Sequence, residues 1–227
     1  MFGYESSTVD WCETNYIMSK YICEFQNSFS SFAYCLLTYY QYRKYNNIID
    51  NNKLFFNLLF INNFLLGLSS FLFHSTLSYI GQFLDEGFIV TFIFLINIIF
   101  SNNYYIVLEL LFAMMFPTYT RFFLFLIGAK HIYQILQKKF SNDIMSGLKL
   151  SLRYFIFSIV FWVLDLVLCN YLLFSLHWLW HIVSAIALYN IVIVTIVYKH
   201  NNMILINKYY INDIQTISLE LQVFPLL

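Results

Sequence analysis

Residues 54–73, LFFNLLFINNFLLGLSSFLF, run for 20 residues without a charged side chain. A helix needs about 20 mainly apolar residues to cross the hydrocarbon core of a bilayer. A long uncharged stretch of this kind is typical of a membrane-spanning helix. Residues 54–73 are therefore expected to form one transmembrane helix.

The composition of the whole chain agrees with that interpretation. Of the 227 residues, 60% are hydrophobic and only 11% are charged, whereas about 25% are charged in soluble proteins. A small soluble enzyme is excluded because it cannot bury so much apolar surface. The net charge of zero argues against a nucleic-acid-binding protein, which needs an excess of basic residues, and the hydrophobicity excludes disorder. With 6 glycines and 2 prolines, an all-α helical bundle fits better than a membrane barrel.

Apolar runs on both sides of this stretch predict a seven-transmembrane bundle. The expected spans are about 25–42, 54–73, 88–100 (beginning near residue 82), 103–117, 120–137, 150–169 and 177–198. The chain is thus expected to be one domain over 1–227, with an N-terminal segment at 1–24 and a tail at 200–227. The first ten residues lack the basic and apolar regions of a cleavable signal peptide.

The distribution of charge predicts the orientation. Lysine and arginine gather in the expected loops 43–53 and 138–149 and in the tail, which all lie on one side of a seven-span chain. Positive charge marks the cytosolic side. The N-terminus is therefore expected to be lumenal or extracellular and the C-terminus cytosolic.

Histidines at the ends of two expected spans suggest a metal site. His177 and His181 are spaced i and i+4, so they share one helix face and can reach one metal ion. His74 closes the second span, and a catalytic zinc site takes three protein ligands and leaves one position open for water. The alternative is a set of interfacial histidines beside Trp178 and Trp180.

Two further groups of polar residues lie on the same side of the expected bundle. Ser70 shares a helix face with His74, and a short turn returns Asp85 to their vicinity; the alternative is a helix end with acids at the next helix start. The N-terminal segment offers oxygen donors of the kind calcium binds, at Asp10, Glu13, Asn15 and Glu24. The spacing alone favours a solvated acidic segment there.

These residues fall in three ordered motifs that resemble the alkaline ceramidases. The motifs are Ser7-Thr-Val-Asp-Trp-Cys-Glu-x-Asn-Tyr16, then Ser70-Phe-Leu-Phe-His74 through Gly81-Gln-Phe-Leu-Asp-Glu86, then His177-Trp-Leu-Trp-His-Ile182. Seven spans with a lumenal N-terminus also match that family. The resemblance implies hydrolysis of the ceramide amide to a sphingoid base and a fatty acid.

The resemblance also implies a role for each residue. Zinc would bind to His74, His177 and His181, while calcium would bind to the side chains of Asp10, Glu13, Asn15 and Glu24 and the backbone carbonyl of Trp11. Asp85 would act as general base on a zinc-activated water, and Ser70 would stabilise the oxyanion. Cys12 and Cys169 would form a disulfide. The partners would be a membrane and a ceramide-type lipid in the endoplasmic reticulum or Golgi, with no nucleic acid and no protein partner.

Other interpretations remain open at this point. The chain could be a related zinc hydrolase acting on another lipid, a receptor of the adiponectin-receptor type, or a structural membrane protein without metal. Asp165 could orient a ligand histidine or lie at the rim of the bundle. Glu109 is expected to make a polar contact within the bundle, and no partner is predicted for Lys130 or His131.

Overall fold

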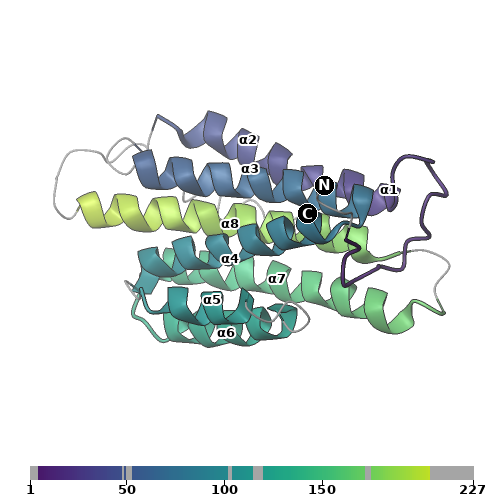
Figure 1. Cartoon of the computed structure of the whole chain (residues 1–227). Coiled ribbons are helices and arrows are strands. Elements are labelled where there is room, and N and C mark those ends of the chain that lie inside the picture. The colour runs from purple at the N-terminus through teal and green to yellow at the C-terminus, as the bar shows by residue number, and fades with distance from the viewer. Residues whose placement is uncertain are drawn as a thin grey trace.

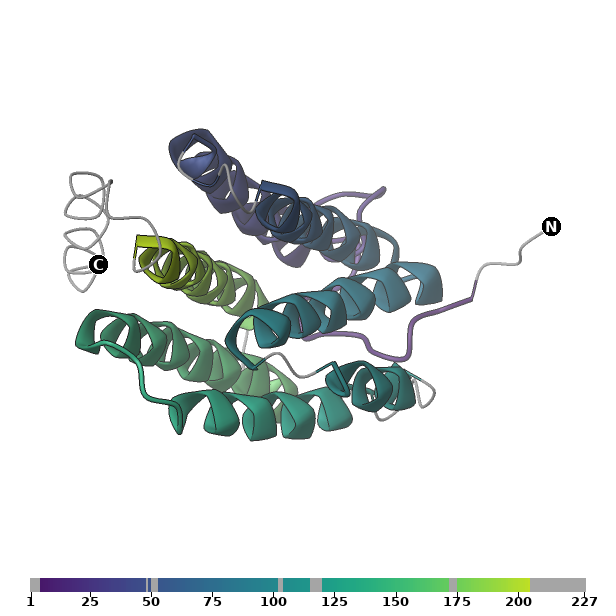
Figure 2. The ribbon, with the colours of Figure 1, turned by 90° about the vertical axis from the view of Figure 1, so that its left-hand side faces the viewer.

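The computed structural model describes residues 5–47, 49, 53–101, 104–114, 120–171 and 175–204. Within these ranges the chain forms eight α-helices and no extended strand. The helices are α1 (Phe25–Ser30), α2 (Phe32–Tyr45), α3 (Lys53–Thr76), α4 (Tyr79–Ser101), α5 (Ile106–Met114), α6 (Thr120–Leu136), α7 (Asn142–Leu168) and α8 (His177–Ile204). They lie side by side in a bundle (Figure 1), which Figure 2 shows closer to end-on.

Helix α8 lies in the middle of the bundle, where it packs against α1, α2 and α7. Its second half reads IVIVTIV, a β-branched run that would favour a strand in a soluble protein. In a bilayer a helix satisfies every backbone hydrogen bond within one segment, so the run is helical here. Val192 and Val194 are completely buried.

Four helices of the described chain are long and apolar enough to cross a membrane: α3, α4, α7 and α8. Large apolar side chains remain exposed on their outer faces, for example Leu54, Leu58 and Ile61 on α3 and Val160 and Val163 on α7. So much exposed apolar surface is typical of contact with lipid. The fold is therefore that of an all-α integral membrane protein.

Each of the seven expected spans overlaps a helix in the described chain, but only four of these helices are long enough to cross a membrane, and several boundaries differ. The span expected at 25–42 is divided at Ser31 into α1 and α2. The Ser31 hydroxyl donates to the carbonyl oxygen of Asn27 at 2.9 Å, a side-chain bond that commonly bends a helix. In the span expected at 103–117, α5 ends at Met114, and residues 115–119 lie outside the described chain.

The prediction of a loop at 138–149 is mostly wrong, because α7 already begins at Asn142. Ile144 and Leu148 lie four residues apart on one helix face and are both buried in the largest apolar cluster, which explains the earlier start. Helix α8 likewise continues past the expected end at 198, to Ile204. The expected tail beyond residue 204 lies outside the described residues.

Close packing of α2 against α3 brings two serines together near one end of the bundle. A Cβ atom added to Gly67 would lie 2.5 Å from Cys35 Sγ and 3.0 Å from the Ser31 carbonyl oxygen. Small residues allow this kind of close helix contact in membranes. One turn beyond Gly67, Ser70 Oγ lies 3.0 Å from Ser31 Oγ, within hydrogen-bond distance.

The N-terminal segment crosses the end of the bundle where α3 and α7 end and α8 begins (Figure 1). Backbone hydrogen bonds fix it to the turn between α3 and α4: Ser7 N–H donates to the Leu77 carbonyl and Tyr79 N–H to the Glu5 carbonyl, both at 2.8 Å. This end of the bundle carries the polar residues that the sequence singled out.

Candidate metal centre

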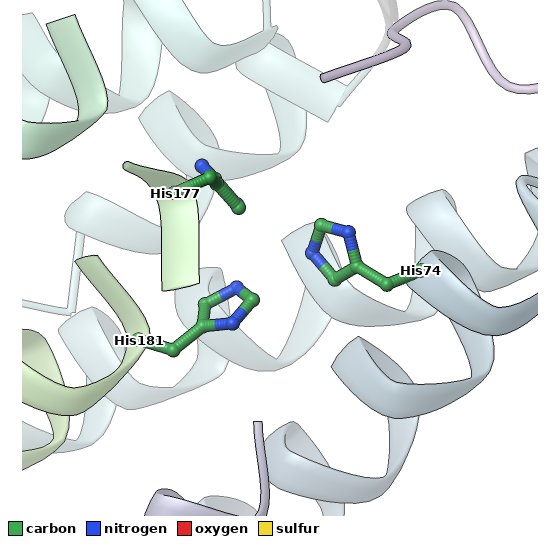
Figure 3. A group of neighbouring side chains, drawn as sticks. All are labelled: His74, His177 and His181. Carbon is green, nitrogen blue, oxygen red and sulfur yellow. The ribbon is translucent and has the colours of Figure 1, made fainter. Parts of the chain in front are cut away.

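Three buried histidines meet between α3 and α8. His74 lies in the last turn of α3, and His177 and His181 occupy the first two turns of α8. Their exposed fractions are 0%, 3% and 2%, and one nitrogen from each lies within 4.8 Å of the others. The side chains point toward a common space (Figure 3). This group could bind a metal ion.

The hydrogen bonds of two of these rings leave nitrogens turned toward that space. His74 Nδ1 bonds to Glu24 Oε2 at 2.5 Å, while His74 Nε2 is buried without a hydrogen-bond partner. His181 Nδ1 lies 2.8 Å from Ser30 Oγ. A histidine that donates one ring N–H to an outer partner presents its other nitrogen to a metal. A buried acceptor nitrogen without a partner is costly, so a metal ion fits this donor set.

The ring of His177 packs flat on the indole of Trp11. The ring centroids are 3.6 Å apart and the planes are inclined by 21°. The family resemblance implied only a backbone carbonyl contribution from Trp11, toward calcium. Its stacking on a candidate metal ligand connects the N-terminal segment to α8.

Ser70 and Asp85 lie beside the histidines, as the short turn between their helices requires. Ser70 Oγ is 3.5 Å from His181 Nε2, and its side chain lies near the Asp85 carboxyl group. Ser70 is only 1% exposed, whereas Asp85 on α4 is half-buried. A hydroxyl and a carboxyl group thus face one side of the histidine cluster, where a reacting carbonyl and a water molecule could meet.

The oxygen donors predicted for calcium lie close together in the N-terminal segment. Asn15 Nδ2 donates to both carboxylate oxygens of Asp10 at 3.2 Å, and Glu13 accepts from the backbone N–H groups of Gln26 and Asn27 at 2.6 and 2.8 Å. Asn15 Oδ1 is buried without a hydrogen-bond partner. An orphan amide oxygen beside carboxylates is the kind of donor set that calcium uses.

Burial raises the pKa of these carboxyl groups. It is the main cause at Asp10 and at Glu13, and the nearby charge of Glu24 raises both values further. Burial also raises the pKa of Glu24 to about 7. Crowded, partly desolvated carboxylates repel each other unless a proton or a cation neutralises them.

Glu24 connects the two candidate metal sites. The side chain is completely buried, and Oε1 accepts from the backbone N–H of Trp11 at 2.9 Å. Oε2 accepts from His74 Nδ1 and from Asn27 Nδ2. The sequence predicted Glu24 only as a calcium donor. The spacing of residues in the sequence could not predict its contact with His74. It also could not predict the contacts of Ser30 and Ser31 with His181.

The structure joins Cys12 to Cys169 in a disulfide, the pair that the family resemblance implied. The other two cysteines, Cys23 and Cys35, are buried free thiols, and a buried thiol packs as a small apolar group. The disulfide ties the N-terminal segment to the end of α7, across 157 residues of chain.

Loss of this disulfide is expected to destabilise the protein measurably. The Cys12→Ser variant should unfold about 4–8 °C below the wild type, because removing a native disulfide costs at least about 2 kcal/mol and 1 kcal/mol corresponds to about 2–4 °C at this size. Thermal unfolding in detergent measures the shift, with Cys35→Ser as a control thiol. Equal melting temperatures for Cys12→Ser and the wild type would contradict the prediction.

Comparison with known proteins identifies the relatives of this chain. A family model described as Ceramidase matches residues 3–214. Alkaline ceramidase 1 of Homo sapiens is 26% identical over 215 residues, which cover 82% of this chain and 80% of that protein. Alkaline ceramidase 1 of Mus musculus is 27% identical over 87% of this chain and 82% of that protein. Alkaline ceramidase of Drosophila melanogaster is 38% identical over a shorter region, 44% of this chain and 36% of that protein.

Proposed function

Because the chain belongs to the ceramidase family, we propose that it hydrolyses the amide bond of ceramide to a sphingoid base and a free fatty acid. The observation that carries this proposal is the buried cluster of His74, His177 and His181 with Ser70 and Asp85 beside it. An amide is a poor electrophile, and this set would supply a base and an oxyanion donor beside a metal that could activate water.

The three histidines would hold zinc, for which nitrogen ligands in a set of three are suited. Bound there, zinc would polarise the amide carbonyl and lower the pKa of a water molecule to about 7. Asp85 would take a proton from the attacking water and deliver it to the leaving amine. Ser70 would donate a hydrogen bond to the negative charge that develops on the amide oxygen.

The apolar interior of the bundle suits a lipid substrate. We propose that α1 with α2, α5 and α6 complete a seven-span bundle around the four long helices. The acyl chain of ceramide would lie among these helices. The three histidines lie at the end of the bundle that carries the N-terminal segment, so the amide would be cleaved near one face of the membrane.

The proposed orientation places the N-terminus in the lumen of the endoplasmic reticulum or Golgi and the C-terminus in the cytosol. A glycosylation-acceptor tag fused at the N-terminus is expected to be modified, and the same tag at the C-terminus is expected to stay unmodified, because basic residues mark the cytosolic side. Mobility shifts after glycosidase treatment report both results. The reverse pattern would favour the topology of an adiponectin-receptor relative.

Calcium would bind at the N-terminal segment through Asp10, Glu13, Asn15, Glu24 and the Trp11 carbonyl. It would neutralise the crowded carboxylates and hold Trp11 and Glu24 against His177 and His74. Calcium would then support catalysis without touching the substrate.

Weakening the calcium site is expected to lower activity while zinc stays bound. Asp10→Asn, or transfer of the wild type to calcium-free buffer, should reduce ceramide hydrolysis about 10-fold, the lower end of the effect of outer-shell changes at metal sites. Activity is measured across a calcium titration, and zinc content is measured in the same samples. Glu5→Gln removes an exposed acid of the same segment as a control. Calcium-independent activity in the wild type would contradict the calcium site.

Purified protein in detergent tests the function as a whole. Bound zinc is measured together with fatty-acid release from ceramides of different chain length. Stoichiometric zinc with release of fatty acid supports the proposal. Stoichiometric zinc without hydrolysis of any ceramide would favour another lipid substrate or a receptor, and absence of zinc would overturn the metal centre.

A further inference from the structure

Asp165 lies at the junction of three segments near the metal centre. It belongs to the last turns of α7, and its exposed fraction is 0%. Of the two alternatives considered for Asp165, a position at the rim of the bundle is therefore excluded. A buried carboxylate is stable only when donors surround it. Asp165 meets this requirement with four hydrogen bonds, three accepted by Oδ1 and one by Oδ2.

One oxygen of Asp165 fixes the start of α8. Oδ1 accepts from the backbone N–H groups of Leu176 and His177 at 2.5 and 3.1 Å and from the Ser175 hydroxyl at 2.9 Å. The first N–H groups of a helix have no partner within the helix, and a negative charge there is favourable. Asp165 therefore sets the position of the first turn of α8, which carries His177 and leads into His181.

The other oxygen holds the N-terminal segment. Oδ2 accepts from the backbone N–H of Cys12 at 3.2 Å, and Cys12 is also linked to Cys169, one turn beyond Asp165. The neighbouring residue, Trp11, stacks on the ring of His177. One carboxylate thus holds the backbone of His177 and the segment that packs on the His177 ring.

We propose that Asp165 is a positioning residue that couples the N-terminal segment to the metal ligand His177. The proposal rests on the zinc and calcium sites of the proposed function. Through Asp165, calcium at the N-terminal segment would steady both the backbone and the ring of His177. Calcium should therefore slow the loss of zinc from the protein, and this effect should depend on the side chain of Asp165.

Two substitutions separate the two halves of the contact. Asp165→Ala removes all four acceptor contacts and is expected to speed transfer of zinc to a colorimetric chelator about 10–100-fold, as loss of an outer-shell partner does elsewhere. Asp165→Asn keeps one oxygen, which the three donors on the α8 side should attract. Its NH₂ group would then face the Cys12 N–H, donor against donor.

The asparagine variant should therefore retain zinc nearly as well as the wild type but lose the effect of calcium on zinc release. Zinc-transfer rates with and without calcium are compared for the wild type, both variants and Ser158→Ala. Ser158 is a fully buried residue of α7 whose hydroxyl donates to Phe155 of the same helix, so it controls for general damage to α7. Hydrogen exchange of the first turn of α8 provides a second readout, expected to be faster in Asp165→Ala alone.

The outcomes distinguish this proposal from the proposed function. Wild-type zinc release and calcium dependence in Asp165→Asn would overturn the coupling, and this variant decides if Asp165→Ala does not fold. Zinc release that responds to calcium through Asp165, in a protein that cleaves no ceramide, would support the coupling and overturn only the substrate assignment. A wild-type protein without zinc would overturn both.

Discussion

His181→Ala is expected to abolish zinc binding and to reduce ceramide hydrolysis by at least about 10³-fold. The expectation follows from the requirement of a catalytic zinc site for three protein ligands, since two nitrogens hold the ion far more weakly. His181 is 2% exposed and lies on α8 one turn after His177, within the three-histidine cluster. Zinc content by mass spectrometry and fatty-acid release are measured on the same purified sample.

His131→Gln is the matched control for this experiment. His131 is also a buried histidine, but it lies on α6 and bonds to Glu109 at 3.1 Å, away from the three-histidine cluster. The control is expected to keep stoichiometric zinc and wild-type activity. A folded His181→Ala protein with full zinc and full activity would contradict the metal centre, and loss of zinc in both variants would point to general destabilisation.

Asp85→Asn is expected to reduce turnover by about 10²–10⁴-fold while leaving zinc bound, because it removes the proposed proton acceptor and no metal ligand. An amide side chain fills nearly the same volume beside Ser70. The fall should therefore appear in kcat more than in KM. Steady-state kinetics on a short-chain ceramide and zinc analysis measure the two effects.

Glu86→Gln provides the comparison for Asp85. Glu86 follows Asp85 in α4 and accepts a hydrogen bond from Gln82 Nε2 at 2.9 Å, an interaction that a glutamine oxygen can also make. The variant is expected to keep activity within about threefold of the wild type. Equal losses in both variants, or full activity in Asp85→Asn, would show that Asp85 does not act as the base.

The sequence predicted the features that depend on local spacing. Uncharged runs of about 20 residues translate directly into long helices, and an i, i+4 pair such as His177 and His181 necessarily shares one face. The sequence also predicted that His74 would join them, since the expected spans end on the same side. The helix boundaries at Ser31 and Asn142 were missed, because they depend on a side-chain hydrogen bond and on burial of Ile144 and Leu148.

Contacts between distant segments could not be predicted in the same way. Glu24 and His74 are 50 residues apart, and Cys12 and Asp165 are 153 apart. Neither pair shares a helix face or a turn that would fix their separation. Glu109 did have the polar contact that the sequence predicted, with Lys130 and His131 as its partners, but only the packing of α5 on α6 could identify them.

The placement of the candidate metal ligands also sets the order in which this protein can mature. Glu24 and His74 are synthesised early, whereas His177 and His181 come with the final described helix. During synthesis the first half of the chain therefore emerges from the ribosome with only one of the three histidine ligands. Metal loading must wait until α8 has inserted beside α3. A chain truncated before residue 177 would lack two of the three histidines and could not become an active enzyme.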